Sequence, residues 1–211
     1  MENTNKSLIL LAGAPGTGKT YAGNVIKKEF PKLIKLPLDL FKEHIYDEIG
    51  FDDIDQKSFL DEEARQRFYR ALDTLMNWNK PILGDYPFSY VQKPHLEHLI
   101  NKYHYSVITV RLEADTKVLF ERQRQRDITE KRHPGHLMNH YHAGDIIKDR
   151  SQLDGMPSYK LFNKRMKDRE YADFKLGSLI RINVNDFSKI DYRLLIQELR
   201  DYLNSTMISK S

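Results

Sequence analysis

The chain has 211 residues, of which 34 are Lys or Arg and 30 are Asp or Glu, so its formal net charge is +4. This length fits one α/β domain that carries a small lid, and it is long enough to bury a core. The absence of cysteine excludes disulfides, cysteine-ligated metal centres and cysteine nucleophiles. No long apolar run occurs and residues 1–7 are polar, unlike a secretory signal, so we expect a cytoplasmic protein that makes no membrane contact.

Short apolar runs alternate with helical patterns along the chain. The expected strands are residues 8–11, 33–38, 81–84, 106–112 and 179–184. Helical spacing predicts helices at 20–30, from Asp39 to near Gly50, and at 58–78. The alternation predicts an α/β fold with three layers, α/β/α, around five mostly parallel strands. We expect residues 1–211 to form a single domain.

A glycine-rich stretch lies between the first expected strand and the first expected helix. It consists of Gly13, Ala14, Pro15, Gly16, Thr17, Gly18, Lys19 and Thr20. The stretch matches the pattern G-x-x-x-x-G-K-[ST], in which backbone N–H groups and the helix N-terminus face the phosphates of a nucleotide. This pattern predicts that Lys19 contacts the β- and γ-phosphates of ATP and that the Thr20 hydroxyl binds Mg²⁺.

Two carboxylates follow the next expected strands, at the sheet edge where ligands of such folds bind. Asp39 after the second strand is a candidate to orient an attacking hydroxyl or to accept its proton. The alternative for Asp39 is a plain helix cap. Asp85 after the third strand is a candidate to hold Mg²⁺ through water, and its alternative is an ordinary turn aspartate. The aromatic residues Tyr86, Phe88 and Tyr90 either line an acceptor pocket or pack the loop.

An arginine-rich segment follows the fourth expected strand. Arg122 and Arg126 are four residues apart and share a helix face, and Arg132 follows just before His133-Pro134-Gly135-His136. Guanidinium groups stabilise the charge that develops during phosphoryl transfer, so the segment at about 122–142 is a candidate lid. For Arg124 and Lys131 we favour a surface role in ion pairs.

Two further features carry weaker information. His136 and His140 would share a face if the segment were helical, but no carboxylate or cysteine completes a metal site, so we favour a polar lid. The basic residues at 160–169 suit either a solvated helix face, which we prefer, or a polyphosphate or nucleic-acid contact.

Together, the loop at 13–20, Asp39, the strand that ends at Asp85, and the string from Arg122 to His136 resemble the P-loop kinases. That group includes bacterial polynucleotide kinase domains, chloramphenicol phosphotransferase and zeta toxins. The resemblance covers roughly residues 8–142 and only in outline residues 179–204. It implies a five-stranded parallel core, an acceptor-hydroxyl role for Asp39, and phosphate-clamping roles for Arg122, Arg126 and Arg132.

Three functions are compatible with these features. We favour an ATP- and Mg²⁺-dependent kinase whose acceptor is a hydroxyl of a small molecule or of a nucleic-acid 5′ end, with no obligate protein partner. A nucleotide-driven switch is less favoured because the run that ends at Asp85 holds a single acid. A nucleotide-binding regulator without catalysis is the third alternative. The motif typical of guanine recognition, Asn-Lys-x-Asp, does not occur.

Overall fold

The computed structural model describes residues 6–129, 132–146, 149–150 and 153–208. The strands are β1 (Ser7–Ala12), β2 (Ile34–Pro37), β3 (Ile82–Asp85), β4 (Ser106–Glu113) and β5 (Ser178–Asn183). The α-helices are α1 (Lys19–Glu29), α2 (Leu38–Ile49), α3 (Ile54–Asn77), α4 (Lys93–Tyr103), α5 (Thr116–Thr129), α6 (Tyr159–Arg169) and α7 (Tyr192–Ile208). Short 3₁₀ helices occur at Pro134–His136 and Phe187–Lys189.

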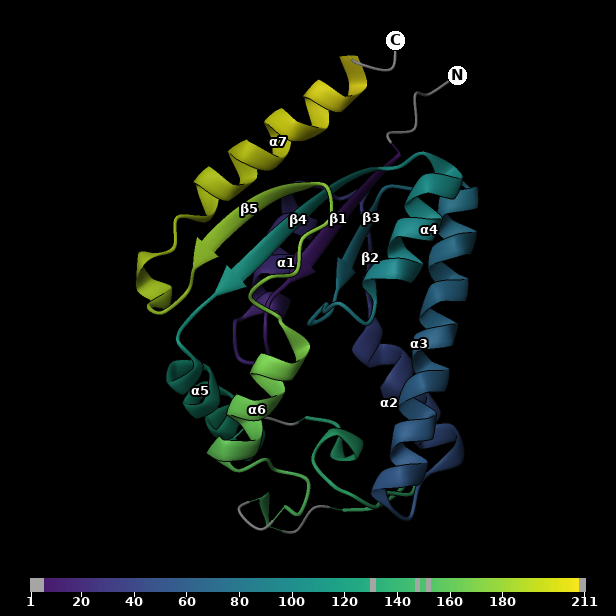
Figure 1. Ribbon diagram of the computed structural model, residues 1–211, viewed down its shortest axis with the longest axis vertical. Helices are drawn as coiled ribbons and strands as arrows, with labels where there is room; N and C mark the ends of the chain where they lie inside the picture. Colours follow the sequence, from purple (N-terminus) through teal and green to yellow (C-terminus); the bar gives the residue numbers. More distant parts are fainter. Residues whose placement is uncertain (1–5, 130–131, 147–148, 151–152, 209–211) are drawn as a thin grey trace.

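The five strands form one sheet in the order β2-β3-β1-β4-β5, and every neighbouring pair is parallel. The predicted fold class is confirmed (Figure 1). Strand β1 lies at the centre of this order, and its residues at 7–12 are all buried. Strands β3 and β4 lie on opposite sides of β1, so the loop that follows β1 lies between their C-terminal ends. Ligands of doubly wound sheets bind at this position.

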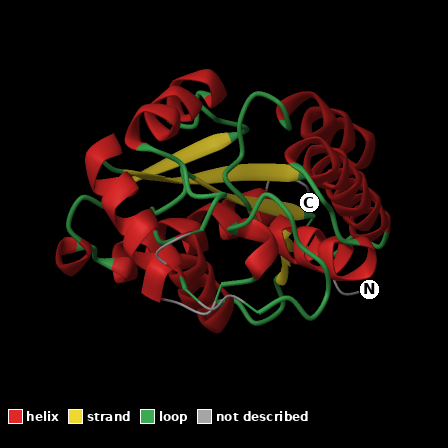
Figure 2. Cartoon of the chain, turned by 90° about the horizontal axis from the view of Figure 1, so that it is seen from below, coloured by secondary structure: helices red, strands yellow, loops and turns green. Residues whose placement is uncertain are grey.

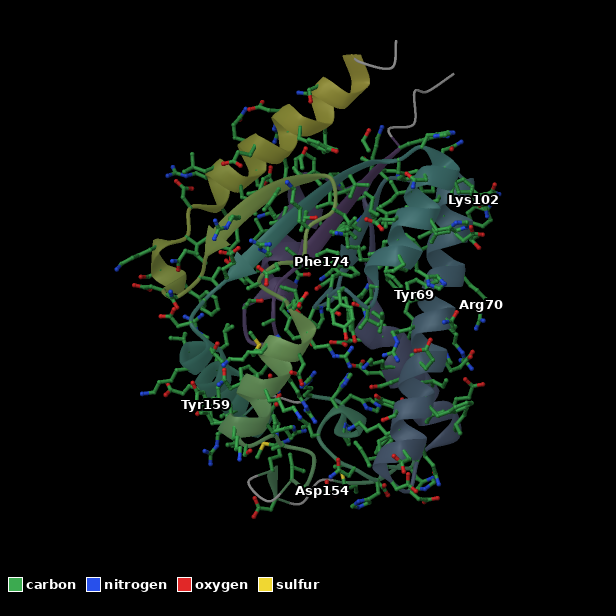
Figure 3. The ribbon with its side chains drawn as sticks, in the orientation of Figure 1. Tyr69, Arg70, Lys102, Asp154, Tyr159 and Phe174 are labelled. Carbon is green, nitrogen blue, oxygen red and sulfur yellow. The ribbon has the colours of Figure 1, made fainter. Side chains whose placement is uncertain are left out.

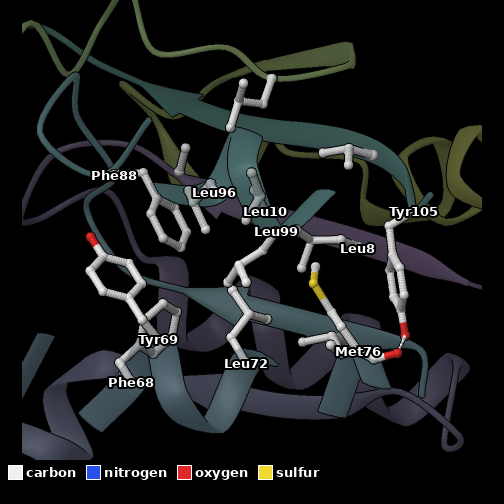
Figure 4. Close-up of a cluster of buried hydrophobic side chains, with 14 of the residues drawn as sticks. Leu8, Leu10, Phe68, Tyr69, Leu72, Met76, Phe88, Leu96, Leu99 and Tyr105 are labelled. Atoms are coloured by element: carbon white, nitrogen blue, oxygen red, sulfur yellow. Dashed lines mark hydrogen bonds between the residues drawn. The ribbon is translucent and has the colours of Figure 1, made fainter. Parts of the chain in front are cut away.

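Alternate side chains of the central strands point to two separate cores, as the period of two of a strand requires. Leu8 and Leu10 pack against α3 and α4, whereas Ile9 and Leu11 pack against α1 and α7. Figure 4 shows the first core, in which Phe68 and Leu72 of α3 approach β1. Figure 2 shows helices on both sides of the sheet, which gives the predicted three layers.

Two aromatic residues of α3, Phe68 and Tyr69, belong to the core. Phe68 is fully buried and meets Phe88, and Figure 4 shows both rings. Phe88 in turn stacks on Phe174, which lies in the segment before β5 (Figure 3). The helix begins at Ile54, four residues before its predicted start. The side chain of Asp53 caps it by accepting hydrogen bonds from the backbone N–H groups of Asp55 and Gln56.

Helices α5 and α6 lie beyond the C-terminal ends of the strands, opposite α2 and the first half of α3 (Figure 1). The predicted lid segment therefore spans two parts of the molecule. Its first residues belong to α5, and its later residues reach the connection between α2 and α3 through an antiparallel bridge between Phe51 and Tyr141. No helix among the described residues is both long enough and apolar enough to cross a membrane.

Candidate phosphate and acceptor site

The loop at residues 13–18 joins β1 to α1, so the predicted strand, loop and helix are confirmed. Gly13, Gly16 and Gly18 have φ angles of 128°, 86° and 81°, which residues other than glycine rarely adopt. A Cβ atom on Gly16 would lie 2.6 Å from the carbonyl oxygen of Leu119. The glycines therefore let the loop curl while it presses against the start of α5.

Lys19 bends back across this loop. Its Nζ atom donates hydrogen bonds to the carbonyl oxygens of Gly13 and Ala14, at 2.8 and 2.9 Å. Thr17 steadies the turn because its hydroxyl donates to the carbonyl oxygen of Ala14 at 2.8 Å. Thr20 lies in the first turn of α1 with its side chain exposed. The ammonium group of Lys19 and the hydroxyl of Thr20 thus lie where the loop joins α1.

Asp39 is the second residue of α2, whose N-cap is Pro37 without any side-chain cap. The interpretation of Asp39 as a helix cap is therefore wrong. Burial raises the pKa of Asp39, but His136, Lys42 and nearby cations from the arginine segment and the loop outweigh it and hold this pKa below its usual value. Asp39 is consequently a carboxylate surrounded by positive charge, suited to accept a hydrogen bond from a hydroxyl.

Asp85 is the last residue of β3 and lies beside Leu11 of β1 in the sheet. It is 8% exposed, and Lys35 of β2 is its ion-pair partner at 3.5 Å. Burial raises the pKa of Asp85, although Lys19 and Lys35 oppose the shift. A carboxylate at this strand end offers the kind of oxygen ligand that Mg²⁺ prefers.

The electrostatics of Lys19 show which groups converge at the loop. Burial lowers the pKa of Lys19 to about 8, and Asp85 and Asp39 oppose this effect while Arg126 and Arg132 reinforce it. These five residues come from four segments of the chain. All five are predicted site residues that the fold brings to one sheet edge.

Asp127 holds the two lid arginines, Arg126 and Arg132, together. It is 2% exposed, and its Oδ1 atom accepts hydrogen bonds from Arg126 at 3.2 and 3.3 Å and from Arg132 at 3.1 Å. Arg150 adds donors to the backbone oxygens of Asp127 and Arg132. Sequence reasoning did not single out Asp127, because adjacent Arg and Asp residues in a helix give no sign of which carboxylate will be buried.

Arg122 takes a different position from the other arginines. It donates to the carbonyl oxygens of Val184 and Asn185 at 2.5 and 2.8 Å, in the segment between β5 and α7. Its guanidinium carbon lies 3.8 Å from the centroid of the Phe187 ring. The Phe187 ring also lies beside Gly18 of the phosphate loop. The structure therefore groups Arg122 with the β5–α7 segment and separates it from Arg126 and Arg132.

The turn at Pro134–His136 docks on α2. Gly135 lies so close to the Tyr46 ring that a Cβ atom would be 2.5 Å from it, so glycine is required here. His136 pairs with Glu43 and His133 with Asp47, both at 3.0 Å. Docking of this turn explains how Arg132 and His136 come near Asp39, although they are far apart in the sequence.

The two later histidines of this segment pair with different carboxylates. His142 pairs with Asp52 at 2.8 Å and His140 with Asp154 at 3.5 Å. Among the described residues, no group of three or more His, Asp or Glu side chains is placed to hold a metal ion. Residues 137–140 are not helical, so His136 and His140 share no helix face. Arg124 is exposed, and Lys131 lies outside the described residues.

The three aromatic residues after β3 differ in how exposed they are. Phe88 is fully buried in the core, and Tyr90 is 54% exposed. Tyr86 lies between them in exposure, and the Nζ atom of Lys42 is 5.9 Å from its ring centroid. Only Tyr86 therefore faces the region around Asp39.

A family model described as an AAA domain matches residues 9–142. The chain belongs to this family. The match covers the phosphate loop, both strand-end carboxylates and the arginine segment, so the predicted P-loop kinase-like relationship is confirmed. None of the curated proteins compared with the chain matches it.

Solved structures share the fold. A kinase-like protein from Chloroflexus aurantiacus is 24% identical with a TM-score of 0.72, over 94% of this chain and 98% of that one. A gluconokinase from Sinorhizobium meliloti is 12% identical with a TM-score of 0.53, over 95% and 93%. The APS kinase of Mycobacterium tuberculosis, solved with AMPPNP and APS, is 13% identical with a TM-score of 0.55, over 95% and 98%. At these identities the likeness establishes the kinase-like fold and leaves the substrate open.

Proposed function

We propose that the protein is a kinase that transfers the γ-phosphate of ATP to a hydroxyl group. The observation that carries this proposal is that the loop with Lys19, the start of α2 with Asp39 and the end of β3 with Asp85 lie at the same edge of the parallel sheet. The two lid arginines act on the same ammonium group of Lys19. A P-loop, a carboxylate for the acceptor and cations for the transferred group are the parts that phosphoryl transfer requires.

Each part has a distinct role. The backbone N–H groups of residues 13–18 and the ammonium of Lys19 bind the β- and γ-phosphates. Thr20 and Asp85 would hold Mg²⁺, which supplies charge neutralisation of the phosphates when bound. Asp39 orients the acceptor hydroxyl and takes its proton, and Arg126 and Arg132 stabilise charge on the transferred group.

Arg122 is proposed to act at a different point. We assign Arg122 to holding the β5–α7 segment against the phosphate loop. Its bonds to that segment and its contact with Phe187, whose ring lies beside Gly18, support this assignment. The segment at about 122–142 is the lid of a single domain, and its docking on α2 closes the site over the acceptor.

Transfer from γ-labelled ATP to a panel of hydroxyl compounds tests the proposal. Lys19→Ala is expected to abolish transfer, and Asp39→Asn to lower kcat with ATP binding retained. Asp55→Asn is the matched control, because it removes an exposed acid from the first turn of α3 and leaves the site untouched. Transfer by Lys19→Ala at the rate of the unmodified protein would refute the proposal.

The same assay addresses the alternative function of a nucleotide-driven switch. A switch would release phosphate from ATP rapidly without any acceptor, and its rate would rise with DNA or a protein partner. The kinase proposal instead predicts that hydrolysis without acceptor is slow and that the lid arginines matter most when acceptor is present.

A further inference from the structure

The surface next to Asp39 is built from two helices and a loop. Asp39 and Lys42 are three residues apart in α2, so they share one face of the helix. The Nζ atom of Lys42 lies 2.9 Å from Oδ2 of Asp61 in α3. Tyr86, after β3, completes what we call the acceptor wall: Asp39, Lys42, Asp61 and Tyr86. The phosphate mechanism uses only Asp39 of these four.

A buried tyrosine, Tyr46, fixes the position of the Lys42–Asp61 pair. The hydroxyl of Tyr46 donates to Oδ1 of Asp61, and Tyr46 itself is 1% exposed against Gly135. The side chains of Lys42 and Asp61 are 12% and 26% exposed, so each keeps an accessible edge. The wall thus presents an oriented donor and an oriented acceptor side by side.

Four basic side chains around the wall already have hydrogen-bond or ion-pair partners. Lys42 is paired with Asp61, and His136 with Glu43 at 3.0 Å. Arg65 pairs with Glu62 at 2.6 Å. Lys57 donates to the carbonyl oxygen of Met138 at 2.7 Å. A second phosphate on the acceptor would have to separate a partly buried ion pair to gain a cation here, which is costly.

A paired ammonium and carboxylate match the hydroxyl groups of a polyol. Adjacent hydroxyls can accept a hydrogen bond from Lys42 and donate one to Asp61, and neither group has to lose its partner. The face of Tyr86 offers an apolar surface for the carbon side of a sugar-like ring. The feature that favours an anionic acceptor instead is the exposed basic surface of α6, with Arg165 and Arg169.

We propose that the acceptor is an uncharged polyhydroxylated compound bound on the acceptor wall, an inference that rests on the kinase function proposed above. Asp39 accepts the proton of one acceptor hydroxyl, whose oxygen forms a bond to the γ-phosphorus of ATP. The bond from the γ-phosphorus to the bridging oxygen breaks, and ADP leaves. Lys42 and Asp61 bind neighbouring hydroxyls and select the acceptor.

Matched pairs of acceptors test the inference. Ribose, glucose, adenosine and sorbitol are compared, in kcat/KM, with ribose 5-phosphate, glucose 6-phosphate, AMP and sorbitol 6-phosphate, and with a 5′-hydroxyl oligonucleotide. We expect at least one uncharged compound to exceed its phosphorylated partner tenfold or more, with little change in KM between low and moderate salt. Preference for the phosphorylated members or for the oligonucleotide would overturn the inference and leave the kinase function standing.

Variants of the wall separate selection from catalysis. With the preferred uncharged acceptor, Lys42→Met and Asp61→Asn are each expected to raise the acceptor KM about tenfold or more, with the KM for ATP unchanged. Lys102→Met is the matched control, because it breaks an exposed pair with Asp73, which lies near the C-terminal end of α3 and twelve residues after Asp61. Unchanged acceptor KM in folded Lys42→Met and Asp61→Asn proteins would overturn the inference.

Failure of the underlying kinase function gives a different result. ATP binding is measured by calorimetry on every variant, so loss of folding or of the nucleotide site is seen directly. ATP binding without transfer to any compound of the panel would refute the kinase function, and the inference on the acceptor falls with it.

Discussion

Asp127 is predicted to hold the lid arginines in place, and its removal is therefore a sharp perturbation. Asp127→Ala leaves Arg126 and Arg132 without the carboxylate that accepts their hydrogen bonds. Removing one partner of a buried ion pair costs about 3–5 kcal/mol. Because the arginine side chains are 32% and 23% exposed, water replaces part of what they lose, and we expect about 2–3 kcal/mol in the free energy of unfolding.

Such a loss lowers Tm by roughly 5–10 °C for a domain of this size. The arginines also lose their common anchor, so kcat for phosphoryl transfer should fall about tenfold or more with a small change in the KM for ATP. Asp127→Asn keeps the shape and one oxygen acceptor, and it should show a smaller effect on both quantities. Asp168→Ala, an exposed acid in α6, is the control.

Urea unfolding and steady-state transfer kinetics measure the two effects. Asp127→Ala protein with the stability and kcat of the control would refute the reasoning, because it would show that the arginines need no anchor. A loss of stability with unchanged kcat would restrict Asp127 to a structural role.

Three further predictions concern the loop and the lid. Gly16→Ala should weaken ATP binding about tenfold or more in calorimetry. Gly144→Ala is the control, because Gly144 has a similar φ angle but no atom within 4 Å of the added Cβ, and its ATP affinity should not change. Equal ATP affinities of the two variants would contradict the close approach of Gly16 to α5. Because the pKa of Lys19 is about 8 and bound phosphates raise it, ATP binding at pH 8.5 should take up protons and weaken as the pH rises further. Calorimetry in two buffers of different ionisation enthalpy detects this uptake, and its absence would contradict the assignment. Asp47→Asn should speed hydrogen exchange at residues 132–142, because Asp47 accepts hydrogen bonds from two of their side chains; unchanged exchange would show that the docking does not depend on it.

The sequence predicted the fold well because the evidence for it is local. The apolar runs that became β1 and β4 and the motif at 13–20 depend on neighbours a few residues away. The second strand was placed slightly too long, since Leu38 starts α2 and does not end β2. Pro37 accounts for the change, because it ends the strand and precedes the helix.

The site was predicted only in part, because its remaining members depend on tertiary contacts. Asp127 and the Lys42–Asp61 pair give no pattern in the sequence that would single them out. The turn at Pro134–His136 was recognised as a lid feature. Its docking on Tyr46 was not predictable, because it requires knowing that α2 lies opposite α5.

The measurement that tests the central claim most directly is a calorimetric titration of the protein with ATP in the presence of Mg²⁺. We predict saturable binding at one site per chain and loss of that binding in Lys19→Ala, with Lys28→Ala, an exposed lysine in α1, unaffected. A titration without saturable heat in the unmodified protein, or equal binding in Lys19→Ala, would contradict the account of the phosphate loop.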